Sequence, residues 1–133
     1  MSVTATIHQE QYQTLLDTPS GIFIADEHIE VGGTQKGMNP HELLLGSLAS
    51  CTAITLRMYA NRKEWPLESV QVNVNITVEA DATKGTIIER TIQLNGNLST
   101  EQKERLLYIA NRCPIHKILS GVLHIATNLN NGI

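Results

Sequence analysis

A long apolar segment between Pro40 and Arg62 constrains the fold more than any other feature of this sequence. Asn39 is a favourable N-cap, Pro40 suits the first helical position, and Glu42 completes a capping pattern three residues after the cap. The residues that follow are apolar on nearly every helical face until Arg57. Because a helix that is apolar all round is typical of a protein interior, we predict a buried central helix over Pro40–Arg62.

Segments with the two-residue period of β-strands stand on both sides of this helix. Before it, the strands predicted are Val3–His8, Tyr12–Leu16, and Gly21–Ala25 with His28–Val31 as a third strand or a hairpin, followed by a loop over Gly32–Gly37. The first of them alternates as a half-buried strand does. After the helix, the strands predicted are Val70–Val78, Ile88–Asn97 and Val122–Asn128, with a turn at Asp81–Gly85.

Two further helices are expected before the last strand. Ser99 and Gln102 form a second capping pattern, which opens an amphipathic helix ending near Arg112. A short third helix is expected over Pro114–Leu119. The order is strands, helix, strands, helices, strand, and segregated elements of this kind predict an α+β fold with antiparallel sheets. A length of 133 residues suits a single domain over residues 1–133.

Composition and charge argue against several classes of partner. A net charge of −3 argues against nucleic acid, whose phosphates require a basic face. No fully apolar stretch reaches the roughly 18–20 residues that span a bilayer, so no membrane partner is expected. The N-terminal residues show neither the basic lead nor the apolar core of a signal peptide, and a cytoplasmic location is expected.

The two cysteines, Cys51 and Cys113, lie far apart in the chain and show neither a C-x-x-C pattern nor zinc-ligand spacing. A structural disulfide is unusual in a reducing compartment, so two buried and inert thiols are the simplest interpretation. Cys113 precedes Pro114 at a helix start, where unsatisfied N–H groups depress a thiol pKa. It could equally be a small residue that fills an N-cap. The five histidines lack metal-ligand spacing, and no metal site is expected.

The helical neighbours of Cys51 form a mainly apolar face. At three, four and seven residues from it stand Leu44, Ser47, Leu48, Ile54, Thr55 and Met58. This composition suits a pocket for a hydrophobic substrate, but taken alone it is more typical of core packing.

Two motifs then give the chain a resemblance to a known family. The segment Met38–Cys51 (MNPHELLLGSLASC) is similar to the central-helix motif of the OsmC/Ohr family, and Asn111–Lys117 (NRCPIHK) matches its second cysteine motif. The order of the elements agrees over essentially the whole chain. The resemblance implies an intertwined homodimer in which antiparallel sheets wrap around long central helices. The better-studied members are thiol peroxidases that reduce organic hydroperoxides without a metal or organic cofactor.

The resemblance also implies roles for individual residues. Cys51 would be the peroxidatic cysteine that attacks the peroxide, and Cys113 the resolving cysteine that closes a disulfide. An external dithiol would recycle the pair. The apolar substrate pocket would be formed by Leu44, Leu48, Ile54 and Met58.

The activating groups of the peroxidase members are not matched at their usual positions. Those members use an arginine from the N-terminal half and a glutamate ten residues before the first cysteine. Here the first arginine is Arg57, which follows Cys51, and His41 occupies the position of the glutamate. Lys36 and His41 are expected as substitutes. Glu42 is a further supporting candidate, although on a regular helix it lies nearly opposite Cys51.

Two functions from different classes therefore stay open. The first is a cofactor-free thiol peroxidase for organic or lipid hydroperoxides. The second is a non-catalytic dimer of the same fold that binds a small apolar ligand or senses oxidants, with cysteines that only pack. A third function, disulfide exchange with proteins, is less favoured because a closely spaced C-x-x-C is absent.

Overall fold

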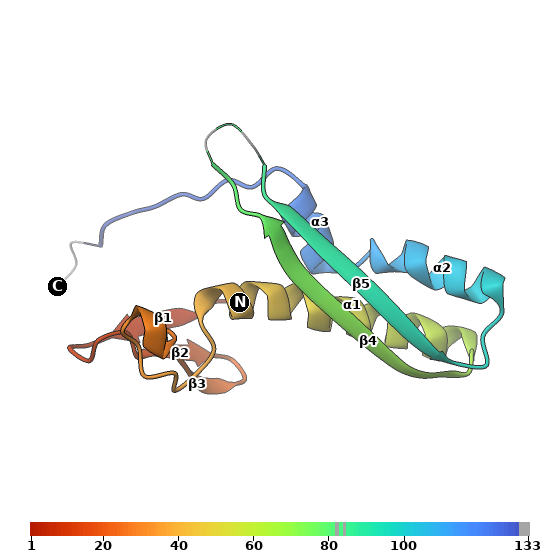
Figure 1. The fold of residues 1–133 in the computed structure, drawn as a ribbon, viewed down its shortest axis with the longest axis horizontal. Helices are drawn as coiled ribbons and strands as arrows, with labels where there is room; N and C mark the ends of the chain where they lie inside the picture. Colours follow the sequence, from red (N-terminus) through yellow and green to blue (C-terminus); the bar gives the residue numbers. More distant parts are fainter. Residues whose placement is uncertain (82, 84, 131–133) are drawn as a thin grey trace. The chain divides into compact units, whose positions relative to one another are not determined.

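The computed structural model describes residues 1–81, 83 and 85–130. The chain divides into two compact units, residues 1–47 and residues 48–133, and each is described by itself (Figure 1). The architecture is mixed α+β with antiparallel sheets and one long helix, as predicted. The expectation of a single domain over residues 1–133 stays a prediction.

The first unit contains a three-stranded antiparallel sheet. Its strands, in the order β1-β2-β3, are β1 (Thr4–Ile7), β2 (Thr14–Thr18) and β3 (Gly21–Ala25). All three were predicted from the sequence, but β1 is exposed along its whole length rather than half-buried. The predicted extension at His28–Val31 is wrong, because Ile29–Val31 forms a short 3₁₀ helix, η1. Gly32 ends this helix in the left-handed conformation, which glycine adopts without strain.

Asp26 organises the loop that follows this sheet. Its side chain is 2% exposed, and its carboxylate accepts hydrogen bonds from the Thr34 hydroxyl at 2.6 Å and from the backbone N–H of Lys36 at 3.1 Å. The Thr34 bond is the main cause that lowers the pKa of Asp26 to about 2. Gly37 passes so close to the backbone of Ile24 that a Cβ at this position would collide with it. The predicted glycine-rich loop is therefore an ordered turn around one carboxylate.

The long helix α1 (Pro40–Lys63) begins at the predicted cap, where Asn39 Oδ1 accepts a hydrogen bond from the Glu42 N–H at 2.8 Å. Burial on every side is not found in the single chain. The buried residues are Leu48, Thr52, Leu56, Tyr59 and Ala60. On another side Ile54 and Met58 are 56% and 69% exposed. The prediction of an all-round buried helix is therefore confirmed for one side only, because the chain's own elements cover only that side.

By length and composition α1 is also long and apolar enough to cross a membrane. This is weak evidence, because the core helix of a soluble protein meets the same criterion. The sequence expectation was that no stretch reaches the apolar length that spans a bilayer, and α1 corrects it by the criterion of length and composition alone.

The second unit is built around a long antiparallel hairpin (Figure 1). Its strands are β4 (Leu67–Val78) and β5 (Ile87–Gly96), and they are followed by the helices α2 (Thr100–Ala110) and α3 (Pro114–Ser120). Ser99 and Gln102 make the reciprocal capping bonds that were predicted. The predicted turn at residues 81–85 includes residues 82 and 84, which lie outside the described residues.

The core of the second unit lies between α1, α2 and one face of the hairpin. Its buried members are Leu56, Tyr59, Leu106, Ile109 and Ala110, and partly buried side chains of the hairpin, Val70, Ile92 and Leu94, pack against them. These hairpin residues share one face because strand side chains alternate. The second unit therefore fixes the middle of α1 and the start of α3 on one framework.

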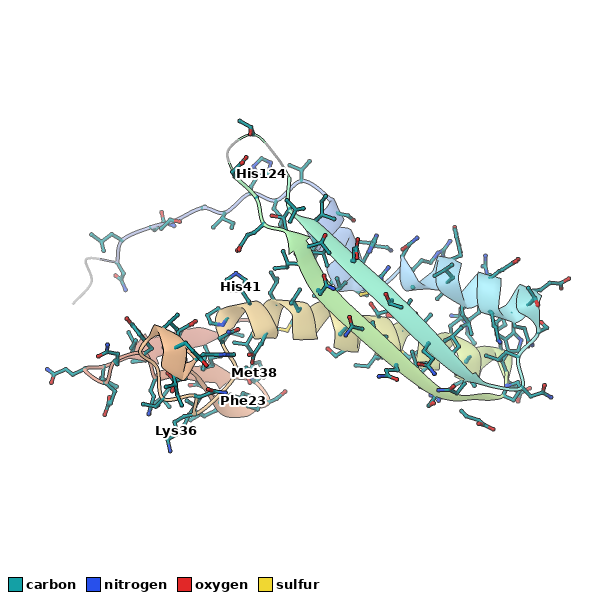
Figure 2. All side chains as sticks on the ribbon, in the orientation of Figure 1. Phe23, Lys36, Met38, His41 and His124 are labelled. Atoms are coloured by element: carbon teal, nitrogen blue, oxygen red, sulfur yellow. The ribbon has the colours of Figure 1, made fainter. Side chains whose placement is uncertain are left out.

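The last predicted strand, Val122–Asn128, is wrong. The segment has no regular structure, and Val122 and Ile125 are 86% and 87% exposed. An alternating pattern forms a strand only beside a partner edge, and the described part of the chain pairs no strand with this segment. His124 lies on this segment (Figure 2).

Candidate functional site

The second unit brings the two cysteines into contact. Cys51 lies near the middle of α1 and Cys113 is the N-cap of α3. Both thiols are free, and a side-chain hydrogen bond joins them. Cys113 is fully buried, whereas Cys51 is partly exposed. A reagent in solution therefore reaches Cys51 first, and the second thiol lies directly behind it.

Cys113 is surrounded by hydrogen-bond donors. Its Sγ accepts from the backbone N–H of His116 at 3.5 Å. Burial raises the pKa of Cys113, but hydrogen bonds from the Cys51 thiol, the backbone N–H groups of His116 and Ile115, and the Thr52 hydroxyl outweigh it. The pKa of Cys113 therefore lies below its ordinary value. This agrees with the prediction that donors at the start of this helix face the sulfur.

The pKa of Cys51 moves in the opposite direction. Burial is the largest cause that raises it, and the hydrogen bond to Cys113 adds to the rise. The Ile115 N–H and the Thr55 hydroxyl lower the pKa of Cys51, but by less. When this coupled pair carries one proton, the geometry favours the proton on Cys51 and the negative charge on Cys113.

Arg90 of β5 connects this pair to a positive charge. Its Nη1 donates to Thr52 Oγ1 at 3.0 Å and to the carbonyl oxygen of Ala110 at 3.4 Å. Its Nη2 donates to Asn111 Oδ1 at 2.9 Å. Thr52 is fully buried, and its hydroxyl also lies 2.7 Å from the carbonyl oxygen of Leu48. The guanidinium is therefore separated from the thiol pair by one hydroxyl group.

Arg90 and Thr52 are not among the residues expected from the sequence. The resemblance places the activating arginine before the first cysteine, and Arg90 follows it. One signal was nevertheless present, because Arg90 occupies an inward position of β5 between Ile88 and Ile92. A charged residue on the apolar face of a strand requires a buried partner.

Two cavities lie against the site within the second unit. One, of about 260 Å³, is lined in part by Leu48, Arg90 and His116. Burial and then the charge of Arg90 lower the pKa of His116, so its ring is neutral near pH 7. The other cavity, of about 400 Å³, is lined in part by Thr55 and Met58.

The expected pocket residues do not share one cavity. Leu48 lines the first cavity and Met58 the second, while Ile54 and Met58 line a third of about 300 Å³. Leu44 belongs to the first unit and is 40% exposed. The role of these four residues as one substrate pocket stays a prediction.

The expected activating residues Lys36, His41 and Glu42 also belong to the first unit. Glu42 Oε1 lies 2.7 Å from Nε2 of His28, and this bond is the main cause that raises the pKa of His28. The side chain of Lys36 extends outward from the first unit, and His41 is exposed (Figure 2). Their roles in activating Cys51 stay predictions.

The described residues contain no group of three or more His, Cys, Asp or Glu side chains that could hold a metal ion.

Arg57, the first arginine of the chain, donates to the carbonyl oxygens of Leu67 at 2.7 Å and of Glu68 at 3.1 Å. These bonds join α1 to the start of β4. The guanidinium of Arg57 therefore holds α1 to β4.

Comparison with known proteins gives a consistent result. The family model described as "OsmC-like protein" matches residues 33–128. A curated relative named hydroperoxide reductase, from Mycoplasma pneumoniae, is 32% identical over 102 residues, which cover 73% of this chain and 72% of that protein.

Solved structures show the same fold. An OsmC-like protein from Mycoplasma pneumoniae matches with a TM-score of 0.75 and 25% identity, covering 91% of this chain and 87% of that one. An organic hydroperoxide resistance protein from Legionella pneumophila matches with a TM-score of 0.65 and 23% identity, covering 91% and 90%.

Proposed function

Because the chain belongs to the OsmC-like protein family, we propose that it is a thiol-dependent peroxidase that reduces organic hydroperoxides through Cys51 and Cys113. The observation that carries this proposal is the contact between two free thiols, one partly exposed and one buried. The relative named hydroperoxide reductase supports a peroxide-related redox role.

The proposed reaction uses the two thiols in sequence. The Cys51 thiolate attacks the outer oxygen of the hydroperoxide, the O–O bond breaks, and the alkoxide takes up a proton and leaves as an alcohol. Cys51 is thereby oxidised to a sulfenic acid. The Cys113 thiolate then attacks the Cys51 sulfur, an S–S bond forms, and the hydroxyl group leaves as water after protonation. The lowered pKa of Cys113 suits this second step, which requires a thiolate.

An external dithiol would return the pair to the reduced state. It supplies two electrons and two protons and becomes a disulfide itself. Reducing dithiols of this kind are abundant in the cytoplasm, and we propose that the protein acts there. The substrate would be a small organic hydroperoxide, including lipid hydroperoxides, and nucleic acid and membrane are not proposed as partners.

The test is the reaction of the reduced protein with cumene hydroperoxide, followed by intact-mass spectrometry and by peroxide loss. We expect one disulfide per chain between Cys51 and Cys113 for each peroxide consumed. Since the pKa of Cys51 is raised, its thiolate fraction is small at pH 7, and the rate should rise with pH by about tenfold per unit below that pKa. Survival of both thiols for many minutes in equimolar peroxide would exclude the peroxidase.

One observation favours a second candidate function. The raised pKa of Cys51 slows attack on peroxide, as would suit a non-catalytic protein that binds a small apolar ligand and whose cysteines only pack. In that case the disulfide would form slowly, and an external dithiol would not sustain peroxide consumption.

We also propose that two copies of the chain associate through the exposed side of α1. Ile54 and Met58, four residues apart on the helix, are both exposed there, and apolar side chains exposed together mark interaction sites. We propose a second copy of the chain as the partner. The chain's own elements cover one side of α1, and the other side, which is apolar too, needs a similar apolar surface to pack against.

The substitution Ile54→Glu should convert the dimer to a monomer, because it places a charge in the apolar contact. Size-exclusion chromatography with light scattering measures the mass directly. Val122→Glu is the matched control, since it adds the same charge at an exposed apolar position in an irregular segment. An unchanged dimer mass for Ile54→Glu, or a monomeric wild type, would contradict the proposal.

A further inference from the structure

Four cationic side chains line a single cavity of the second unit. They are Arg62 of α1, Arg105 of α2, Arg112 of the connection between α2 and α3, and Lys117 of α3. The whole chain has only ten Lys and Arg residues and a net charge of −3. A large share of the positive charge of the chain is therefore gathered at one site, although the chain as a whole is acidic.

Three of these cations, Arg62, Arg105 and Arg112, contact tyrosine side chains. The guanidinium of Arg62 lies 5.2 Å from the centre of the Tyr59 ring, and Arg105 Nε donates to Tyr59 Oη at 3.0 Å. Arg105 and Arg112 lie 5.0 and 5.5 Å from the centre of the Tyr108 ring. Among the described residues, no salt bridge joins any of the four to a carboxylate. Like charges gathered in this way repel each other, and a bound anion would relieve the repulsion.

The same cavity has an apolar wall that leads to the thiols. Met58, Ile109 and Pro114 contribute this wall. Thr55 also lines the cavity and hydrogen-bonds the Cys51 thiol, while Pro114 directly follows Cys113. A molecule with an anionic end and an apolar body would therefore match both parts of the cavity. Its anionic end would lie by the cations, and its apolar body would lie along the apolar wall toward the cysteines.

We propose that this cavity binds the carboxylate of an organic substrate, with Arg62, Arg105 and Arg112 as its ligands. The arginine side chain suits this role because its planar fork matches a carboxylate. The hydroperoxides that react best are then those that carry a carboxylate as well as an apolar body. The identity of the substrate rests on the proposed peroxidase function, whereas anion binding does not.

The binding experiment uses 4-isopropylbenzoate, which has the apolar body and the carboxylate but no peroxide. Titration of the reduced full-length protein, followed by calorimetry at low salt, should show saturable binding that weakens as salt is added. The double variant Arg62→Gln with Arg112→Gln should bind about tenfold more weakly or worse. Lys103→Gln is the matched control, because it removes one charge from α2 without altering the lining of this cavity.

The kinetic experiment compares cumene hydroperoxide with its para-carboxylate derivative. In the wild type, kcat/KM should be higher for the carboxylate, mainly through a lower KM. In the double variant the ratio of the two kcat/KM values should fall toward one, and in Lys103→Gln it should keep the wild-type value. Because this ratio compares two substrates of one protein, partial loss of folded protein does not alter it.

Three results would overturn the inference. They are no saturable binding of isopropylbenzoate, equal binding by the double variant, or tighter binding of inorganic phosphate than of isopropylbenzoate. Failure of the peroxidase reaction alone would leave the binding titration intact. Conversely, a peroxidase with equal preference for the two substrates would refute the carboxylate site while retaining the proposed reaction.

Discussion

Replacing Cys51 by serine should abolish peroxide reduction, with a loss on the order of 10³-fold or more. A serine hydroxyl stays protonated at neutral pH and does not attack the O–O bond as a thiolate does. Cys51 is the partly exposed thiol of the pair, so we expect it to meet the peroxide first. The measurement is the initial rate of cumene hydroperoxide loss in the presence of an excess of dithiol.

Cys113→Ser is the informative companion. It should consume one equivalent of peroxide per chain and then stop or slow sharply, because no second thiol is left to resolve the sulfenic acid. A dimedone-type trap and intact-mass spectrometry detect that sulfenic acid on Cys51. If Cys113→Ser consumed no peroxide while Cys51→Ser reacted once, the two roles would be reversed, as the lower pKa of Cys113 would then explain.

The substitution Arg90→Gln has the second largest expected effect. Arg90 makes hydrogen bonds to Thr52, Ala110 and Asn111, and a glutamine cannot replace all of them or the charge. We expect a loss of about 2 kcal/mol in the free energy of unfolding, measured by urea denaturation. The pKa of Cys113 should rise as well, since the hydroxyl of Thr52 loses the guanidinium that orients it.

The thiol pKa is measured by the pH dependence of alkylation with iodoacetamide, with each cysteine followed by peptide mass spectrometry. Arg57→Gln is the matched control, because Arg57 also joins α1 to the hairpin by bonds to backbone carbonyls. It should destabilise the protein to a similar degree and leave the pH dependence of Cys113 alkylation unchanged. If the pH dependence of Cys113 alkylation were the same in the two variants, Arg90 would contribute to the stability of the fold only and not to the pKa of Cys113.

Local sequence signals predicted the elements that carry the two cysteines. The Asn39 cap and Pro40 set the start of α1, and the Ser99 capping pattern set the start of α2. The Cys113-Pro114 pair set the start of α3. These signals are reliable because capping bonds join residues only three positions apart.

The sequence predictions that were wrong concern segments whose structure depends on residues far away in the chain. Alternation at Val122–Asn128 predicted a strand, but a strand requires a neighbouring edge that the described chain does not provide. The apolar pattern of α1 predicted burial on all sides, but burial depends on what packs against each side. Arg90 was not predicted as a site residue for the same reason. Its connection to the thiols depends on a hydrogen bond to Thr52, which lies 38 residues away in the sequence.

The sequence by itself determined the family, the α+β class with the order of the helices and the two long strands between them, and the identity of the two candidate cysteines, because motifs, caps and periodicity are local properties. Only the tertiary structure decided that the two thiols touch and that Arg90 stands one hydroxyl away from them. It also decided that four cations share one cavity. Hydrogen bonds and electrostatic interactions act over a few ångströms in space, whatever the separation of the residues along the chain.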